Sequence, residues 1–288
     1  MIVSVASGKG GTGKTMVSTN MALAIGERLT FLDCDVEEPN AHLFLKPKIE
    51  QREQVSTPVP LVDEQKCTFC KKCSDVCRFN AIVVVGTNVM IFKDLCHSCG
   101  GCMFVCPENA ISETGRELGT IEYGHRDAIR FVQGRLRVGE AMSPPMIRKV
   151  RAAAVPHELT IIDAPPGTSC PVIAAMKGVD FVLMVTEPTP FGLHDLQLAV
   201  EAVKILDIPA GLVINRCDIG DRKVYEYAER QNLPILLEIP FDRKIAETYS
   251  CGQSIVEVMP EWKDKFKGIY RDIELHLEGL RKRVSCEN

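Results

Sequence analysis

Residues 6–15 read ASGKGGTGKT, and this stretch decides the fold expected for the chain. It fits the pattern G-x-x-x-x-G-K-[ST] between an apolar segment at 2–6, which predicts a strand, and a segment at 14–27, which predicts a helix. Glycines let backbone N–H groups turn inward around phosphate oxygens, and the helix adds the positive end of its dipole. The stretch therefore predicts a phosphate-binding loop formed by Gly8, Lys9, Gly10, Gly11, Thr12, Gly13, Lys14 and Thr15.

Apolar segments and helical patterns alternate along most of the remaining chain. Segments at 30–33, 160–163, 180–186, 210–215 and 235–240 predict buried strands, and those at 142–154, 193–206 and 221–231 predict helices. This alternation is typical of right-handed βαβ units. We expect an α/β fold, a doubly wound and mainly parallel sheet of the P-loop NTPase type, with ligands beyond the carboxyl ends of the strands.

The alternation stops between residues 58 and 118. We expect 1–57 and 119–288 to form an ATPase domain and 58–118 to form an inserted small α+β domain. The insert holds eight of the 13 cysteines, in two C-x2-C-x2-C-x3-C blocks related by a 29-residue repeat. This spacing is typical of bacterial ferredoxins, in which the fourth cysteine of each block binds the other cluster.

Two [4Fe–4S] clusters are therefore predicted. The first ligand set is Cys67, Cys70, Cys73 and Cys106, and the second is Cys96, Cys99, Cys102 and Cys77. Zinc is the alternative for a cysteine-rich segment, although tetrahedral zinc sites favour paired C-x2-C units. Disulfides are less expected, since clustered thiols in a chain without an export signal more often bind metal.

Composition excludes several classes of protein. The chain has 288 residues, a net charge of −4 and a pI of about 5.9, which argues against a basic nucleic-acid surface. No apolar run approaches the length of a membrane span, and residues 1–7 read as a strand and not as a signal peptide. We expect a cytoplasmic protein with no nucleic-acid partner and no stable membrane insertion. An apolar stripe on the C-terminal helical segment, expected to pack on the sheet, comprises Trp262, Phe266, Ile269, Ile273, Leu277, Leu280 and Val284.

Further candidate residues stand at the ends of the predicted strands. Asp163 closes LTIID and is expected to hold Mg²⁺ together with Thr15, while Lys14 neutralises β- and γ-phosphate oxygens. Asp35 follows the second strand and is the candidate for positioning the attacking water, although it could instead only support its loop. Gly167 is expected to turn a backbone N–H towards the γ-phosphate, and Asn215 to contact adenine.

The motifs GKGGTGKT, DAPPG and NR together resemble those of the deviant Walker A ATPases, which include MinD, ParA, the Mrp-type cluster carriers and the nitrogenase iron protein. The resemblance implies that Lys9 reaches across a dimer to the other subunit's phosphates and that Arg216 lies at the nucleotide. With the cysteine blocks, the chain resembles MinD-like ATPases that carry an inserted ferredoxin domain. Cys170 stands where the nitrogenase iron protein has a cluster ligand, but no second cysteine lies between Cys106 and Cys170.

These observations lead to one main functional hypothesis and one alternative. The first is a Mg²⁺-dependent ATPase that forms an ATP-dependent homodimer, or a heterodimer with a paralogue. It would couple the ATP/ADP cycle to electron transfer, or to metallocluster assembly, on a protein partner. The alternative is an ATP-dependent spatial organiser on membrane or DNA, with redox-sensing or structural clusters.

Overall fold

The computed structural model describes residues 1–286, with side chains to residue 282. The chain divides into two compact units. The larger unit contains 1–52, 121–135 and 147–288, and the smaller one contains 53–120 and 136–146. Val284 of the predicted apolar stripe lies outside the described side chains.

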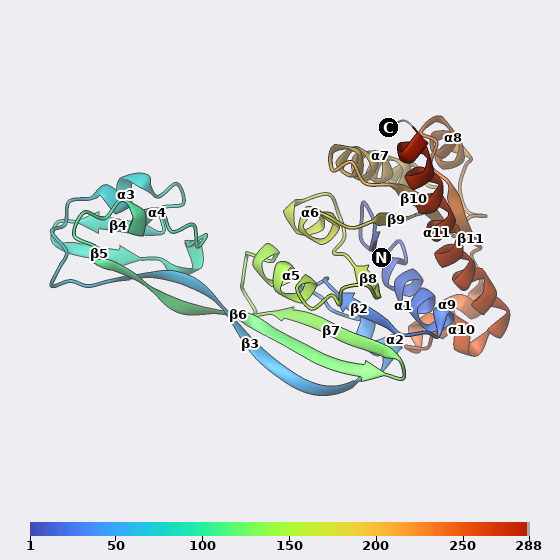
Figure 1. Ribbon diagram of the computed structural model, residues 1–288, viewed down its shortest axis with the longest axis horizontal. Coiled ribbons are helices and arrows are strands. Elements are labelled where there is room, and N and C mark those ends of the chain that lie inside the picture. Colours follow the sequence, from blue (N-terminus) through green and yellow to red (C-terminus); the bar gives the residue numbers. More distant parts are fainter. Residues whose placement is uncertain (287–288) are drawn as a thin grey trace. The chain divides into compact units, whose positions relative to one another are not determined.

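The sheet has nine strands, and its centre is parallel (Figure 1). β1 (Ile2–Ala6) pairs in parallel with β8 (Leu159–Asp163) on one side and with β9 (Phe181–Thr186) on the other. Beyond β9 follow β10 (Ala210–Asn215) and β11 (Ile235–Ile239), and beyond β8 follow β2 (Leu29–Asp33), β7 (Ile129–Leu136), β6 (Ile111–Arg126) and β3 (Lys48–Val62). The mainly parallel α/β sheet expected from the sequence is confirmed.

Helices cover both faces of this sheet. Val5, Phe31 and Ile161 belong to a single buried cluster with residues of α1 and α11, whereas their buried strand neighbours Leu32 and Ile162 do not. Alternation along a strand sends successive side chains to opposite faces, which explains the difference. The helices of the larger unit are α1 (Lys14–Ile25), α2 (Ala41–Leu45), α5 (Pro144–Arg151), α6 (Cys170–Met176), α7 (Pro190–Ile205), α8 (Lys223–Arg230), α9 (Arg243–Ser250), α10 (Ile255–Val258) and α11 (Lys263–Cys286), with a 3-10 turn, η2 (Pro260–Trp262), before the last.

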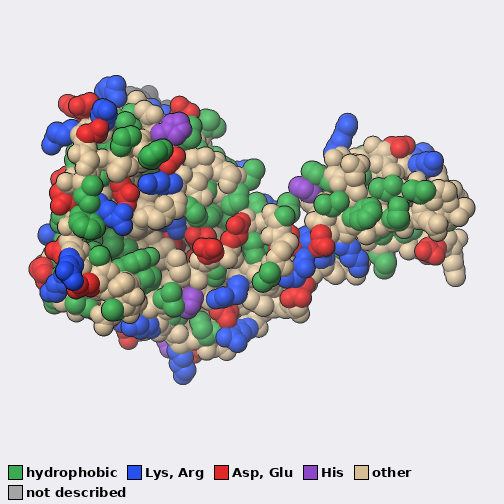
Figure 2. All heavy atoms as spheres, turned by 180° about the vertical axis from the view of Figure 1, so that it is seen from behind, with side chains coloured by type: hydrophobic (Ala, Val, Ile, Leu, Met, Phe, Trp, Pro, Cys, Tyr) green, Lys and Arg blue, Asp and Glu red, His purple; other side chains and the backbone are tan. Residues whose placement is uncertain are grey.

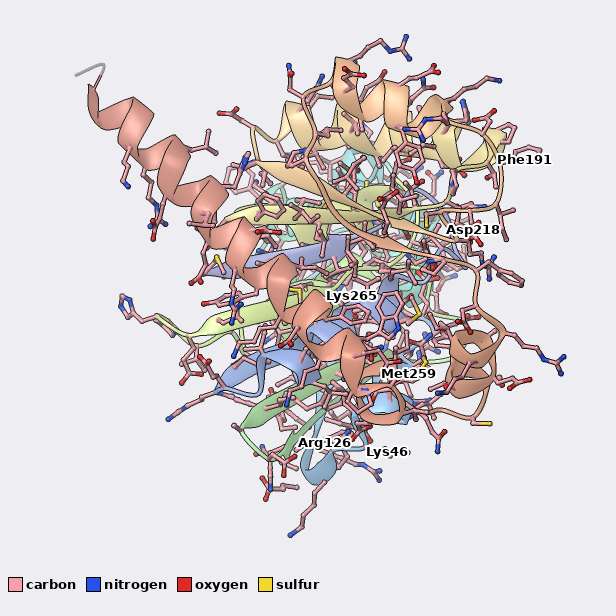
Figure 3. The ribbon with its side chains drawn as sticks, turned by 90° about the vertical axis from the view of Figure 1, so that its right-hand side faces the viewer. Lys46, Arg126, Phe191, Asp218, Met259 and Lys265 are labelled. Carbon is pink, nitrogen blue, oxygen red and sulfur yellow. The ribbon has the colours of Figure 1, made fainter. Side chains whose placement is uncertain are left out.

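The C-terminal helix α11 packs on the sheet with its apolar stripe. Trp262, Phe266, Ile269, Ile273 and Leu277 are all buried in the same cluster as α1. Figure 3 shows α11 running across its side of the larger unit. The expected packing of this stripe is confirmed as far as Leu277, so its apolar side chains up to that residue are covered by protein. Within the described residues no helix has the length and apolar character needed to cross a membrane.

The smaller unit repeats its backbone conformation at the period seen in the sequence. It contains α3 (Lys72–Val76), the antiparallel pair β4 (Ile82–Val85) and β5 (Asn88–Ile91), a 3-10 turn η1 (Lys93–Leu95) and α4 (Gly101–Phe104). Left-handed φ angles recur 29 residues apart, at Phe69 and Ser98, at Lys71 and Gly100, and at Asn80 and Asn109. The two cysteine blocks therefore share one local fold.

The smaller unit includes a segment outside the expected boundaries of the insert. Residues 136–146 belong to it, although the sequence predicts an insert over 58–118 alone. The buried Arg116 forms ion pairs with Glu140 (2.6 Å) and Asp94 (3.3 Å), and Arg137 pairs with Asp94 (2.8 Å). This network ties the segment to the cysteine-bearing unit through contacts that are remote in sequence.

Candidate nucleotide site and cysteine cavities

The glycine loop lies at the carboxyl end of β1 and borders a cavity of about 330 Å³. Gly13 adopts φ 94° immediately before α1, a conformation that favours glycine. A side chain at this position would also come within 2.6 Å of Asn215 Nδ2. The cavity falls in the size range of small-ligand sites, at the sheet edge where parallel α/β folds bind ligands.

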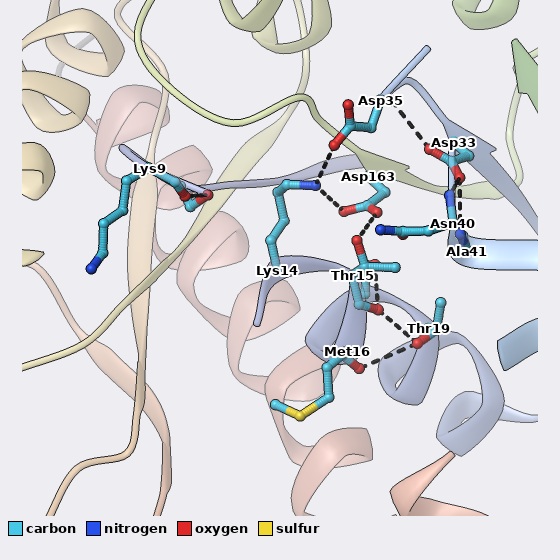
Figure 4. A network of polar contacts seen from close by, with 12 residues as sticks. Lys9, Lys14, Thr15, Met16, Thr19, Asp33, Asp35, Asn40, Ala41 and Asp163 are labelled. Atoms are coloured by element: carbon cyan, nitrogen blue, oxygen red, sulfur yellow. Dashed lines mark hydrogen bonds and ion pairs between the residues drawn. The ribbon is translucent and has the colours of Figure 1, made fainter. Parts of the chain in front are cut away.

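Lys14 is the central cation beneath this cavity (Figure 4). Its Nζ lies 3.0 Å from Asp163 Oδ1 and 3.7 Å from Asp35 Oδ2. The Thr15 hydroxyl donates a 2.6 Å hydrogen bond to the other oxygen of Asp163. Burial by itself lowers the pKa of Lys14, but Asp163 and then Asp35 more than reverse this, so that its pKa is raised overall. The structure thus brings four predicted residues, Lys14, Thr15, Asp35 and Asp163, into contact.

The two aspartates after β2 have different environments. Asp33 is fully buried and accepts hydrogen bonds from the backbone N–H groups of Asp35, Asn40 and Ala41. It therefore supports the loop, and burial followed by repulsion from Asp163 raises its pKa to about 8. Asp35 lines the cavity, and burial raises its pKa to about 6 in spite of the opposing effect of Lys14.

Lys9 extends away from Lys14 (Figure 4). Its Nζ lies 3.5 Å from Glu187 Oε2, and Arg216 pairs with the other oxygen of Glu187 at 2.9 Å. Glu187 follows β9 and is buried, whereas Lys9 and Arg216 both line the cavity. Glu187 is a site residue that the sequence motifs do not indicate. A carboxylate in VTEPTP directly after a buried strand was the signal that could have indicated it.

Asn215 and Gly167 have protein partners in this structure. The Asn215 amide donates to Thr12 O (2.8 Å), and its carbonyl accepts from Arg216 N (3.0 Å). Gly167 has a φ of 98°, and its N–H donates to Ser7 O (2.9 Å). Asn215 thus braces the phosphate loop from the end of β10. Its contact with adenine and the contact of Gly167 with a phosphate stay predictions.

A second wall of the cavity was not expected from the sequence. It comes from the loop after β11 and from α9, where Asp242 caps the helix by accepting from the N–H groups of Lys244 and Ile245. Tyr249 at the end of α9 stacks on Phe44 of α2, with ring centroids 4.8 Å apart. The wall residues share no motif, and they are Pro240, Phe241, Asp242, Ile245, Ala246 and Tyr249.

The smaller unit contains two cavities that are each lined by four cysteines. In each case three cysteines come from one block and the fourth from the other. The groups are the same as the two predicted ligand sets, and they consist of Cys67, Cys70, Cys73 and Cys106 in one cavity and of Cys77, Cys96, Cys99 and Cys102 in the other. The fourth cysteine of each block therefore lines the cavity formed by the other block. The role of these cysteines as cluster ligands stays a prediction.

Backbone N–H groups point at several of these sulfurs. Ala81 N donates to Cys77 Sγ and Ala110 N to Cys106 Sγ, both at 3.3 Å and one repeat apart. Burial alone would raise the pKa of Cys77, but backbone N–H groups of residues 79–82 more than compensate and lower its pKa. Such donors stabilise thiolate, the form in which cysteine binds metal.

Among the side chains that the structure describes, which end at residue 282, no three His, Cys, Asp or Glu converge closely enough to hold a single metal ion. A [4Fe–4S] cluster distributes its four irons, and each thiolate binds a separate iron. The cysteines of each cavity fit such a group in number and in donor chemistry. The cysteine pattern and the cavities thus support the clusters as a prediction, and the structure itself shows only the paired cavities.

Comparisons with known proteins identify the family. A family model described as "CobQ/CobB/MinD/ParA nucleotide binding domain" matches residues 3–255. An uncharacterised protein of Methanocaldococcus jannaschii is 32 % identical over 263 residues, which are 89 % of this chain and 92 % of the relative. An iron-sulfur cluster carrier protein of Pyrococcus abyssi is 24 % identical over 273 residues, covering 88 % of this chain and 78 % of the relative.

Solved structures agree on the fold. The septum site-determining protein MinD of Pyrococcus horikoshii OT3, complexed with Mg-ADP, gives a TM-score of 0.60 at 20 % identity, and the match covers 94 % of this chain and 95 % of that one. The family model spans the phosphate loop, Asp35 and Asn215, which line one cavity, and Asp163, which contacts Lys14. The chain belongs to the CobQ/CobB/MinD/ParA family of nucleotide-binding domains.

Proposed function

We propose that this chain is a Mg²⁺-dependent ATPase that forms a dimer when it binds ATP. Its nucleotide cycle would drive iron–sulfur electron transfer to a partner protein, or metallocluster assembly on one. The observation that carries the proposal is the contact of Lys14 with Asp163 and Asp35 at the base of the cavity. The paired cysteine cavities support the part of the proposal that concerns iron–sulfur clusters.

ATP hydrolysis would use the residues around Lys14. The glycine loop would bind the phosphates, and Lys14 would move from its carboxylate partners to the β- and γ-oxygens. Thr15 and Asp163 would hold Mg²⁺, which neutralises charge on those oxygens. Asp35 would orient a water molecule for attack on the γ-phosphorus, so that the bond to the bridging oxygen breaks and ADP leaves with phosphate.

Dimerisation would give Lys9 its function. In this structure Lys9 is paired with Glu187, and with one-third of its side chain exposed it is accessible from outside the unit. An approaching triphosphate on a second subunit carries more negative charge than one carboxylate and would compete for the ammonium group. Nucleotide-dependent pairing follows from that exchange, because ADP lacks the terminal phosphate.

The cysteines of the smaller unit would hold two [4Fe–4S] clusters, which supply one-electron chemistry when bound. Backbone N–H groups at Cys77 and Cys106 would stabilise the thiolates and tune the reduction potential. The surface of this unit is suited to a protein partner: Figure 2 shows hydrophobic side chains gathered on it, and the Phe104 side chain beside Cys102 is 93 % exposed.

The test is anaerobic purification followed by assays of both halves of the proposal. We expect about eight irons and eight sulfides per chain, ATP hydrolysis, and a dimer with ATP and Mg²⁺ but not with ADP. Asp35→Asn should bind ATP, remain dimeric and lose hydrolysis. If this variant stays monomeric with ATP, ATP-dependent dimerisation is refuted. Equal ATPase rates in cluster-loaded and cluster-free protein would refute the coupling.

A further inference from the structure

The two edges of the nine-stranded sheet differ in character. The β3 edge carries Lys48, Glu50 and Arg52 together with Pro58 and Pro60, and charges and prolines are features that prevent an edge from pairing. The β11 edge begins with three apolar residues, Ile235, Leu236 and Leu237, none of which is fully buried. Within residues 1–286, β11 pairs with β10 alone, so its outer backbone groups face no strand. A register shift against β10 at Leu212 and Val213 interrupts the ladder, but the first three residues of this edge carry neither a charge nor a proline.

A groove runs along the same edge. It is lined by four consecutive residues of β11, 235–238, and by Arg222 and Tyr225 of the α8 region and Lys265 of α11. Figure 3 looks onto this side of the larger unit and labels Lys265 near the start of α11. None of these residues lines the nucleotide cavity. The groove is therefore separate from the site described above.

Two cations flank the groove in fixed positions. The Arg222 guanidinium lies 4.9 Å from the centroid of the Tyr225 ring, and Lys265 Nζ lies 4.1 Å from that of Trp262. Stacking on aromatic rings restricts both side chains without neutralising them. The single carboxylate lining the groove, Glu238, accepts a 2.6 Å hydrogen bond from the Tyr225 hydroxyl. The groove therefore carries a net positive charge next to an apolar strand edge.

We propose that the outer edge of β11 is a docking site for an extended acidic segment of a partner protein, which joins the sheet as an added strand. Main-chain hydrogen bonds would supply affinity, as in other cases of strand addition. Apolar side chains of the segment would contact Ile235, and acidic side chains would meet Arg222 and Lys265. The groove shares no residue with the nucleotide cavity, so the peptide can bind the nucleotide-free chain.

The test uses a fluorescein-labelled peptide of alternating glutamate and valine, seven residues long, and the full chain. We expect saturable binding by fluorescence anisotropy, and protection from hydrogen exchange confined to 235–239 and the groove. A peptide methylated on alternate backbone nitrogens should bind about tenfold more weakly or not at all, because it cannot complete the strand ladder.

A charge-reversal pair provides the matched control. Arg222→Glu combined with Lys265→Glu should weaken binding about tenfold. Lys223→Glu combined with Lys263→Glu changes the net charge equally on the same two elements but lies outside the groove, and it should leave binding unchanged. Absence of peptide binding, equal loss in both variants, equal binding of the methylated peptide, or self-association of the nucleotide-free chain through β11 would each overturn the proposal.

Discussion

The Nζ of Lys9 lies 3.5 Å from the carboxylate of Glu187, and the Lys9 side chain is directed away from Lys14 (Figure 4). The two lysines of one glycine loop thus pair with different carboxylates. Lys14 pairs with Asp163 at the base of the nucleotide cavity, and Lys9 pairs with Glu187 at the rim of the cavity. One lysine is buried and the other is accessible.

Lys9→Ala should retain ATP binding and lose ATP-dependent dimerisation. The reason is that Lys9 lies at the rim and is directed away from Lys14, so its removal leaves the base of the cavity intact. Nucleotide titration and analytical ultracentrifugation with ATP and Mg²⁺ measure the two effects. Lys177→Ala, a change of the same kind on an exposed residue, should alter neither. An ATP-dependent dimer in Lys9→Ala would contradict the assignment of the rim lysine.

Lys14→Ala should lose ATP binding itself. It removes the cation that faces Asp163 and Asp35, and the cavity would then present uncompensated carboxylates to a polyanion. We expect affinity for ATP to fall by at least about 100-fold, since truncating one partner of a buried, hydrogen-bonded charge pair commonly costs about 3 kcal/mol of binding free energy. Isothermal calorimetry with ATP and Mg²⁺ measures this. Affinity equal to that of Lys9→Ala would show that the two lysines are equivalent.

Asp35→Asn should stabilise the nucleotide-free chain at neutral pH. Burial raises the pKa of Asp35 from 3.8 to about 6, so between these values the folded chain binds a proton that the unfolded chain releases. Stability of the wild type therefore falls as pH rises through this window and stays lowered above it. The variant lacks this loss. Its free energy of unfolding should exceed that of the wild type by roughly 1–3 kcal/mol at pH 7.5 and should equal it near pH 4.

Urea denaturation at several pH values measures this difference. The control is Asp264→Asn, a change of the same kind on an exposed residue of α11. A stability difference for Asp35→Asn that is the same at pH 4 and pH 7.5 would mean that the carboxyl group is not held in a pKa-raising environment. A wild-type ATPase rate that does not decline below about pH 6 would count against Asp35 as the water-positioning group.

Gly13→Ala should damage the phosphate loop, and Gly10→Ala should not. Gly13 has φ 94°, and its added methyl group would come within 2.6 Å of Asn215 Nδ2. Gly10 has no atom within 4 Å of such a group. We expect Gly13→Ala to cost about 1–3 kcal/mol of unfolding free energy and to weaken ATP binding. Thermal melting without nucleotide separates the two variants. Equal melting temperatures would contradict the close approach of Asn215 to Gly13.

Paired cysteine variants should reveal the exchange between blocks. Cys67→Ser with Cys106→Ser removes two cysteines of one cavity, and we expect about half of the iron to be lost. Cys67→Ser with Cys77→Ser removes one cysteine from each cavity and should lose nearly all of it, although both residues belong to the first block. Iron analysis after anaerobic reconstitution measures this, with Cys251→Ser as the control. The opposite ranking would show that each block binds its own cluster.

Local sequence patterns were sufficient for the elements that are built from neighbouring residues. The strands at β8, β10 and β11 begin and end within one residue of the segments predicted for them. The helix expected over 14–27 ends earlier, at Ile25, because Gly26 adopts a left-handed conformation that caps it. Periodicity reports on burial, so it locates an element well but leaves its exact end to the cap residue.

The residues of the nucleotide site also fall into those that sequence patterns indicate and those that they do not. The glycine loop and the aspartates were identifiable because chemistry on phosphate requires them in fixed positions next to a strand. Glu187, Asp242 and Tyr249 were not, since they come from two segments distant from the phosphate loop and share no motif. The segment 136–146 likewise joins the cysteine-bearing unit through Arg116, Asp94 and Glu140, and no local pattern predicts such distant ion pairs.

The sequence by itself determined the parallel sheet, the phosphate loop and the repeated cysteine blocks, because each depends on spacing along the chain. Only the tertiary structure decided that Lys9 pairs with Glu187 and that residues 136–146 join the cysteine-bearing unit. It also decided that β11 is left as an open, apolar edge. The physical reason is that charge pairing, cavity lining and strand order are set by contacts between residues far apart in sequence, which chain-local patterns do not encode.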